Sequence, residues 1–211
     1  MGTYEVGVLG GFKGKVGTVV GAQWRGIEYM RHKGKKSRKP RTQEQIEQMA
    51  RFGLAIGFTS TINALLMKSF KGTDRKTGAN AALSIILLTA ISGNYPAFEI
   101  DYSIVQVSNG KLPKADLPVA AATGSGAITF TWTDNPAVTA DFQTDKAVMV
   151  VFCPELQESV YVNGGAARPA GTDSISVPNF TGKEVHTWFA LVSADGKSYA
   201  KSTYTGALTV S

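Results

Sequence analysis

The side chains best suited to catalysis or metal binding are few in this sequence and lie far apart. Its two histidines are His32, inside a run of basic residues, and His186, at the start of an apolar segment. The single cysteine, Cys153, precedes a proline and has no predictable base beside it, so we interpret it as a buried thiol. Zinc sites need several Cys or His residues at short spacings, which this set does not provide. We expect His32 to be solvated and His186 to make a polar contact at a strand end.

The carboxylates give no stronger catalytic pattern. Asp134, Asp141 and Asp145 cluster in one predicted loop, but the order of an EF-hand calcium loop is absent and turn formation explains them more simply. Glu99 and Asp101 alternate along a predicted strand and share a face, yet a glycosidase pair also requires a pocket that the sequence does not reveal. We therefore predict a protein that is not an enzyme, with no cofactor, no metal site and no small-molecule substrate.

A glycine-rich stretch over residues 10–21 must also be tested as a phosphate-binding loop. A Walker loop ends in Gly-Lys-Ser/Thr, whereas Gly14-Lys15 is followed by Val16 and the first glycine position falls on Leu9. The Gly-x-Gly core of a dinucleotide-binding fingerprint is absent from this stretch. We expect these glycines to mark β-bulges or the close approach of another backbone.

The strongest bias in the sequence is a basic run between Gly10 and Arg41. Ten of the 22 Lys and Arg residues lie there, against the single acid Glu28. Three interpretations stay open: a solvated loop, an arm that contacts nucleic-acid phosphates beside Trp24 and Tyr29, or a surface that meets the acidic face of a neighbouring copy. The candidate contact residues for nucleic acid or another polyanion are Lys13, Lys15, Arg25, Arg31, Lys33, Lys35, Lys36, Arg38, Lys39 and Arg41.

Charge is divided unequally along the 211 residues. The net charge is +6, but residues 1–76 carry 15 Lys/Arg against 5 Asp/Glu, and residues 77–211 carry 7 against 11. Such polarity favours a polyanionic partner or head-to-tail contact between copies. The first residues do not read as a signal peptide, and the longest weakly polar run, Thr77 to Ile91, is too short to span a bilayer. We expect a protein made in the cytoplasm, kept there or incorporated in a particle, with no membrane partner.

The first half of the chain is predicted to contain short strands followed by two helices. Thr42 and Gln45 form a capping box that opens a helix running to about residue 70, and an apolar second helix is predicted over about 78–91. Three extended segments precede them, at 4–9, 16–21 and 23–31. The residues that roughly follow the helical period in the first helix are Ile46, Met49, Phe52, Ile56, Asn63, Leu66 and Phe70.

The second half reads as a succession of short strands separated by turn residues. After an alternating segment at 98–107, strands are predicted at 127–133, 146–153, 158–162, 174–177, 185–192 and 199–204. This pattern is typical of a β-sandwich. We predict an α+β fold with two domains. The first (1–111) is a basic region with an N-terminal β-hairpin and two helices, and the second (112–211) is an immunoglobulin/fibronectin-III-like β-sandwich.

Several short motifs together resemble one known family. The resemblance covers essentially the whole chain and is to an uncharacterised family of about this length found in the Bacteroidota, a domain of unknown function with no established activity. The helix-entry motif is also similar to segments of phage virion-associated proteins. The motifs are Gly14-Lys15-Val16-Gly17-x-Val19-Val20, Trp24-Arg25-Gly26, Tyr29-x-Arg31, Thr42-x-x-Gln45, Arg51-Phe52, Trp132-Thr133-Asp134 and His186-x-Trp188.

The leading functional hypothesis is a non-enzymatic structural protein that self-assembles into a homo-oligomer or a phage virion-like particle. Strand addition or domain swapping through residues 4–31 would be the mechanism. The alternative is a nucleic-acid-binding protein that uses the arm 31–41, and a further alternative is recognition of surfaces or carbohydrates by the sandwich loops. The expected partners are copies of the protein itself, nucleic acid or an acidic protein surface.

Overall fold

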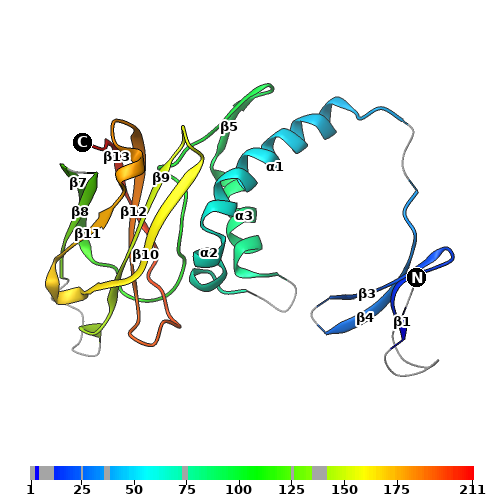
Figure 1. Cartoon of the computed structure of the whole chain (residues 1–211), viewed down its shortest axis with the longest axis horizontal. Coiled ribbons are helices and arrows are strands. Elements are labelled where there is room, and N and C mark those ends of the chain that lie inside the picture. Colours follow the sequence, from blue (N-terminus) through cyan, green and yellow to red (C-terminus); the bar gives the residue numbers. More distant parts are fainter. Residues whose placement is uncertain are drawn as a thin grey trace. The chain divides into compact units, whose positions relative to one another are not determined.

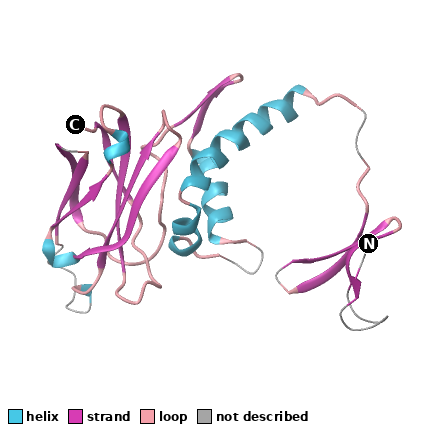
Figure 2. Ribbon diagram, viewed as in Figure 1, coloured by secondary structure: helices cyan, strands magenta, loops and turns pink. Residues whose placement is uncertain are grey.

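The computed structural model describes residues 3–4, 12–24, 26–35, 39–72, 76–124, 126–134 and 142–211. The chain divides into two compact units, Met1–Thr42 and Gln43–Ser211. The described part of the first unit contains strands and loops, and the second contains both helices and strands (Figure 2). The predicted division between residues 111 and 112 falls within the second unit.

The first unit is built around a small antiparallel sheet with the strand order β1-β2-β3-β4. Aromatic and β-branched residues favour its strands. Gly17 and Gly26 lie in the turns between the last three strands at φ 58° and 83°, a conformation that glycine adopts without strain. The predicted hairpin is therefore a three-stranded meander with a two-residue strand at its edge (Figure 1). The strands are β1 (Thr3–Tyr4), β2 (Phe12–Val16), β3 (Val19–Trp24) and β4 (Ile27–His32).

The second unit opens with three helices where the sequence predicted two. The break falls at Ile62, between α1 and α2, and the two helix axes differ in direction by 85°. Thr61 helps to end α1 because its hydroxyl bonds the Phe58 carbonyl at 2.7 Å and the Ser159 hydroxyl at 2.6 Å. The Thr77 hydroxyl accepts the amide of Asn80 at 3.2 Å and caps α3. The helices are α1 (Gln43–Thr61), α2 (Asn63–Ser69) and α3 (Gly78–Thr89).

Among the described residues, no single helix is both long and apolar enough to cross a membrane, although the bent pair α1–α2 meets that test when its members are taken together.

The segment after α3 departs from the predicted strand at 98–107. Only Ala97–Ile100 is a strand (β6), and it pairs with β5 (Ile91–Asn94) in a hairpin that contains a cis Tyr95-Pro96 peptide. The prediction is wrong beyond Ile100, where the chain continues without a regular strand. Val105 and Val107 are nevertheless buried in the core beneath the helices, and their spacing of two residues imitates a strand.

Two antiparallel sheets make up the rest of the second unit. The first has the order β10-β9-β12-β13 and the second has the order β11-β8-β7. The strands are β7 (Asp116–Gly124), β8 (Ala127–Thr133), β9 (Lys146–Cys153), β10 (Glu158–Ala167), β11 (Thr172–Ser176), β12 (Glu184–Val192) and β13 (Thr203–Thr209). Short 3-10 helices at Arg168–Ala170 and Pro178–Phe180 flank β11.

The two sheets enclose one hydrophobic core between their facing sides. Phe130 and Trp132 from the three-stranded sheet meet Phe189 from the four-stranded sheet, with the Trp132 and Phe189 rings stacked at 4.7 Å. Met149 and Cys153 of β9 are fully buried in the same cluster. The predicted burial of the Cys153 thiol is therefore confirmed.

The helices cover the other side of the four-stranded sheet and enclose a second core. Phe58 of α1 contacts Phe152 of β9 with ring centroids 4.9 Å apart, and it lies 5.7 Å from the Trp188 ring. The Trp188 indole N–H donates to the Val105 carbonyl at 3.1 Å, so this buried polar group has a hydrogen-bond partner within the core. Because β9 is buried on both faces, its sequence is an unbroken apolar run rather than an alternating one.

The fold is therefore mixed α+β: an N-terminal sheet, three helices and several antiparallel sheets. The α+β part of the prediction is confirmed, whereas the hairpin and the count of two helices are corrected.

Candidate interaction surfaces

The predicted cations that the structure describes are all exposed. They extend from the small sheet of the first unit to the residues just before α1. Three of the ten, Arg25, Lys36 and Arg38, lie outside the described residues. The described cations are Lys13 and Lys15 on β2, Arg31 on β4, Lys33 and Lys35 after it, and Lys39 and Arg41 before α1.

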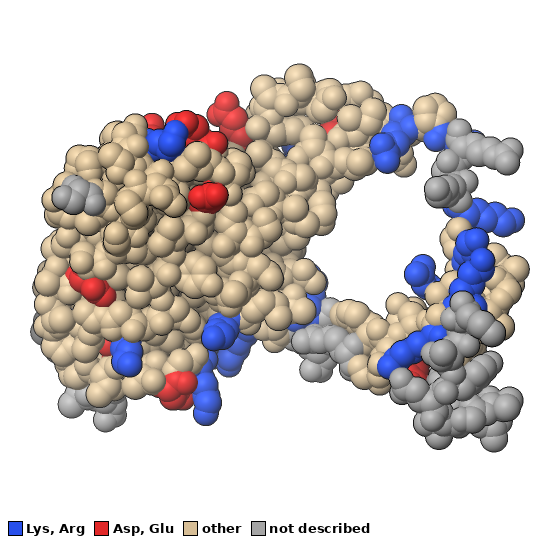
Figure 3. Space-filling model, in the orientation of Figure 1, with Lys and Arg blue, Asp and Glu red and all other residues tan. Residues whose placement is uncertain are grey.

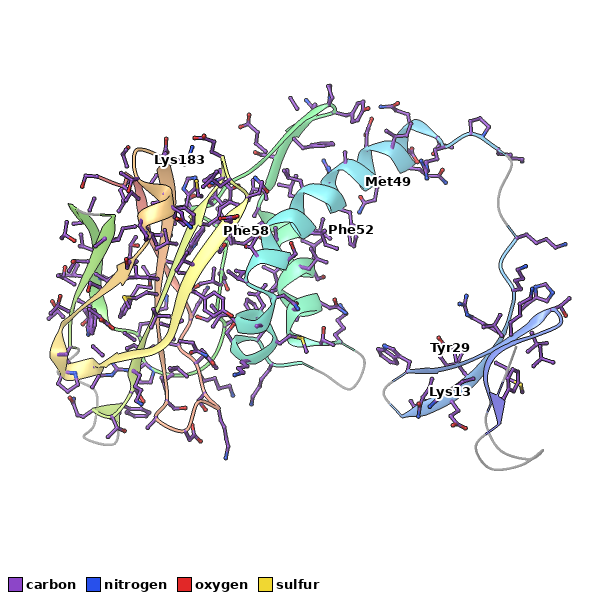
Figure 4. All side chains as sticks on the ribbon, viewed as in Figure 1. Lys13, Tyr29, Met49, Phe52, Phe58 and Lys183 are labelled. Atoms are coloured by element: carbon purple, nitrogen blue, oxygen red, sulfur yellow. The ribbon has the colours of Figure 1, made fainter. Side chains whose placement is uncertain are left out.

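One face of the small sheet combines cations with aromatic side chains. Lys15 pairs with Val20, which pairs with Arg31, so the two cations share a face because directly opposed residues of antiparallel strands point to the same side. Tyr29 and Trp24 share that face by alternation along β4 and β3, and each is 45% exposed. Figure 4 labels Tyr29 and Lys13 on this sheet. Ammonium and guanidinium groups beside exposed rings are suited to phosphates and stacked bases.

The opposite face of the small sheet is largely apolar and also exposed. Val16 pairs with Val19, and Val19 pairs with His32, so these three side chains share it. Met30, two residues before His32, lies there as well and is 70% exposed. Among the residues of the first unit whose burial is described, only Gly21, which has no side chain, is buried. This sheet therefore has exposed apolar residues on both faces, and its described residues do not form a hydrophobic core.

Helix α1 presents a second exposed apolar surface, which we call the α1 stripe: Ile46, Met49, Phe52 and Ile56. The sequence placed these residues on one apolar stripe of the helix, and in the structure all four are exposed. The buried residues of α1 are Ala55, Phe58 and Thr59. Figure 4 shows Phe58 on the side of the helix toward the sheets and Phe52 on the side away from them. Both sets follow a helical period, so periodicity alone could not tell which one is covered.

An acidic end of the second unit lies where β9 ends and where β10 and β12 begin. Glu155, Glu158, Glu184 and Asp101 are exposed there, and Figure 3 shows acidic side chains gathered along this margin, next to basic ones. Burial, and then the negative charges of Glu184 and Asp101, raise the pKa of the nearby Tyr204. The surface is therefore an electrostatic complement to the basic first unit.

His186 lies inside this end as part of an aromatic cluster. Its Nδ1 is 2.8 Å from the Tyr204 hydroxyl, and its ring stacks on Tyr102 at 4.1 Å. Burial lowers the pKa of His186, while the negative charge of Glu184 acts in the opposite direction. The predicted polar contact at a strand end is confirmed. His32 is exposed, with its Nδ1 2.8 Å from the Lys33 carbonyl oxygen.

The aspartates of the predicted turn differ in their burial and in their contacts with Arg168. Asp145 is buried and accepts a bond from the Arg168 guanidinium at 3.0 Å, and Asp134 lies 3.8 Å from the same side chain. Asp141 lies outside the described residues. Arg168 was not singled out from the sequence, where an isolated arginine carries no sign that it is buried. Among the described residues, no three His, Cys, Asp or Glu side chains gather in a way that could hold a metal ion.

These features define an α+β protein with a basic N-terminal sheet and a helix-covered pair of antiparallel sheets. The chain belongs to a family of unknown function (DUF6266), whose pattern matches residues 11–206. This supports the resemblance to an uncharacterised family, while the Bacteroidota origin stays a prediction. No curated protein matches the chain in sequence.

Proposed function

We propose that this protein is a non-enzymatic structural protein that assembles with copies of itself into a homo-oligomer or particle. The observation that carries the proposal is the small sheet of the first unit, which exposes apolar side chains on both faces. Isolated small sheets are marginally stable in water, and covering a side chain such as Met30 contributes ~1.5–3 kcal/mol. A neighbouring copy would supply that cover.

Charge favours a second copy as the occupant. Residues 1–42 carry ten Lys/Arg against two acids, Glu5 and Glu28, whereas residues 43–211 carry 12 against 14. The basic first unit of one copy is complementary to the acidic end of the second unit in another, which is a head-to-tail arrangement. The α1 stripe adds an apolar surface whose spacing of three and four residues suits packing against another helix.

The arrangement of the two large sheets supports an immunoglobulin/fibronectin-III-like sandwich as the structural module. Its first, second and fifth strands (β7, β8 and β11) form one sheet, and its third, fourth, sixth and seventh strands (β9, β10, β12 and β13) form the other. Sandwiches of this class divide seven strands between two antiparallel sheets in a similar way. Such modules serve many unrelated functions, so this part of the proposal concerns architecture alone.

The mass of the protein in solution tests self-assembly. We expect light scattering coupled to gel filtration to show a species larger than the monomer, growing with protein concentration over about two decades. Persistence at about 0.5 M salt would assign the contact to apolar burial, and loss there would assign it to charge. A monomer under every condition would refute the proposal.

A matched pair of variants locates the contact. The double change Ile27→Ser with Met30→Ser removes one exposed apolar side chain from each face of the small sheet, and we expect it to shift the assembly toward monomer. Leu117→Ser removes a side chain of similar exposure from β7 of the second unit and should leave assembly unchanged. Equal assembly of both variants would show that the small sheet is not the contact.

A second candidate function, nucleic-acid binding, is favoured by the mixed cationic and aromatic face of the small sheet. Lys15 and Arg31 would contact phosphates, while Trp24 and Tyr29 would stack on bases. We expect affinity for a single-stranded oligonucleotide to fall steeply with salt. Arg31→Ala and Tyr29→Ala should each weaken it, whereas Lys114→Ala, an exposed change in the second unit, should not. Unchanged binding in the first two variants would remove this candidate.

The predicted arm 31–41 is tested separately by one multiple variant. Replacing Lys33, Lys35, Lys36, Arg38 and Lys39 by alanine should abolish salt-sensitive binding if the arm holds the phosphates. If that variant binds normally while Arg31→Ala does not, the sheet face rather than the arm is the nucleic-acid surface.

A further inference from the structure

A pocket of the second unit gathers four lysines from three separate segments of the chain. It has a volume of about 280 Å³ and lies between the end of α2, the segment at residues 109–112 and the turn at 197–199. Lys68 and Lys71 come from the first of these, Lys111 from the second and Lys197 from the third. Figure 3 shows several Lys and Arg side chains at the lower margin of this unit, with acidic side chains among them. None of the described residues that line the pocket is an aspartate or a glutamate.

The walls of the pocket are held by hydrogen bonds between these segments. The Ser69 hydroxyl donates to the Val107 carbonyl at 2.8 Å, and the Asn109 amide donates to the Ser69 carbonyl at 3.1 Å. On the other side, the Leu112 amide donates to the Tyr199 carbonyl at 3.1 Å. The lysine side chains therefore project from a backbone frame that is already fixed.

Stabilisation of the fold explains the positions of only some of these four lysines. Lys68 lies in the last turn of α2, where a cation complements the helix dipole, and Lys71 lies two residues beyond the end of that helix. Lys111 and Lys197 are not on a helix. Lys197 lies 4.0 Å from Asp195, and both side chains are highly exposed, so this pair is weak. Four like charges around one concavity repel each other, and a bound anion would relieve that repulsion.

We propose that this pocket binds a small phosphate-bearing anion through Lys68, Lys71, Lys111 and Lys197. Ammonium groups are compact donors that suit phosphate oxygens, and Asn109, which lines the same pocket, carries a side-chain amide that can act as a neutral donor. The volume lies near the lower end of the range for small-molecule sites, which fits a pyrophosphate or a phosphate ester. This site is separate from the small sheet and does not depend on self-assembly.

Calorimetry with inorganic pyrophosphate tests the proposal on the full chain. We expect saturable binding that is tighter than that of sulfate at equal ionic strength and that raises the melting temperature of the second unit. The double variant Lys111→Ala with Lys197→Ala should bind roughly tenfold more weakly. The control, Lys146→Ala with Lys201→Ala, removes two exposed lysines outside the pocket and should bind normally.

Two further measurements separate this site from the basic first unit. Replacing Lys33, Lys35 and Lys39 by alanine should leave pyrophosphate binding unchanged, and a loss in that variant would move the site to the first unit and overturn the proposal. Adenosine should not bind, whereas adenosine monophosphate should, because the phosphate is the recognised group. Equal pyrophosphate affinity in the pocket variant and the unmodified protein would also overturn it. All four substituted lysines of the paired variants are exposed, so unchanged circular dichroism is expected throughout.

Discussion

Replacing Arg168 by alanine is expected to destabilise the second unit far more than removing an exposed charge. The Arg168 side chain is 0% exposed and donates to Asp145 at 3.0 Å, to the Pro113 carbonyl at 2.8 Å and to the Phe142 carbonyl at 3.2 Å. Its own carbonyl accepts the Trp132 indole at 2.8 Å. Truncation at Cβ would leave the Asp145 carboxylate buried without its counter-charge.

The magnitude follows from this burial. Removing one partner of a buried ion pair costs about 3–5 kcal/mol, because the remaining charge stays desolvated. Domains of ordinary stability unfold at a cost of about 5–15 kcal/mol, so the loss is a large share of the total. For a unit of this size each kcal/mol corresponds to about 2–4 °C in melting temperature, which gives a fall of about 10 °C.

Circular dichroism melting of the Arg168→Ala variant measures the effect, with Lys183→Ala as the matched control. Lys183 pairs with Glu155 at the surface (Figure 4), where an ion pair contributes at most about 1 kcal/mol. Equal melting temperatures for the two variants would refute the argument. The change should also weaken pyrophosphate binding, because Arg168 holds Phe142, which lines the lysine pocket.

Three more predictions concern other parts of the molecule. Burial lowers the folded-state pKa of His186, so the unfolded chain binds the proton more readily and stability should fall as pH drops below about 6.5; urea midpoints should show a smaller fall in His186→Gln. Phe58→Ala should cost about 3–5 kcal/mol in urea unfolding, whereas Phe52→Ala, on the exposed side of the same helix, should cost less than about 1 kcal/mol. Gly21→Ala would drive its new methyl group into the Phe12 backbone, so amide exchange across residues 12–32 should become faster while the second unit melts unchanged.

The strands predicted most accurately from the sequence are those whose burial requires a continuous run of apolar residues. The predicted segments 146–153 and 185–192 agree with β9 and β12 to within a residue, because each strand contains a long apolar run, at 147–153 and 188–192. The segment predicted at 199–204 is displaced from β13, Thr203–Thr209, because Tyr199 and Ala200 are buried outside the strand. The strand predicted at 158–162 is shorter than β10, which continues through Gly164 and Gly165 to Ala167 with irregular pairing to β9.

The surfaces were predicted less completely than the strands. The described cations of the basic run are exposed, as is usual for lysine and arginine, but their exposure does not choose among the three interpretations left open by the sequence. The mixed face of the small sheet requires the register of Lys15 with Arg31, which the sequence does not contain. The lysine pocket and the Arg168 network each join segments far apart in the chain. Contacts of this kind follow from tertiary packing and leave no local pattern.

The coverage of β9 on both faces determines when the second unit can fold during synthesis. A chain made from its N-terminus completes α1, α2 and α3 before the strands against which they pack. Phe58 therefore lacks its full set of aromatic partners until Trp188, on β12, has left the ribosome. A stalled or prematurely ended chain would retain an uncovered apolar helix cluster, which makes it a ready substrate for chaperones and proteases. Completion of this core is in this sense a late event in the synthesis of the second unit, because it waits for β12.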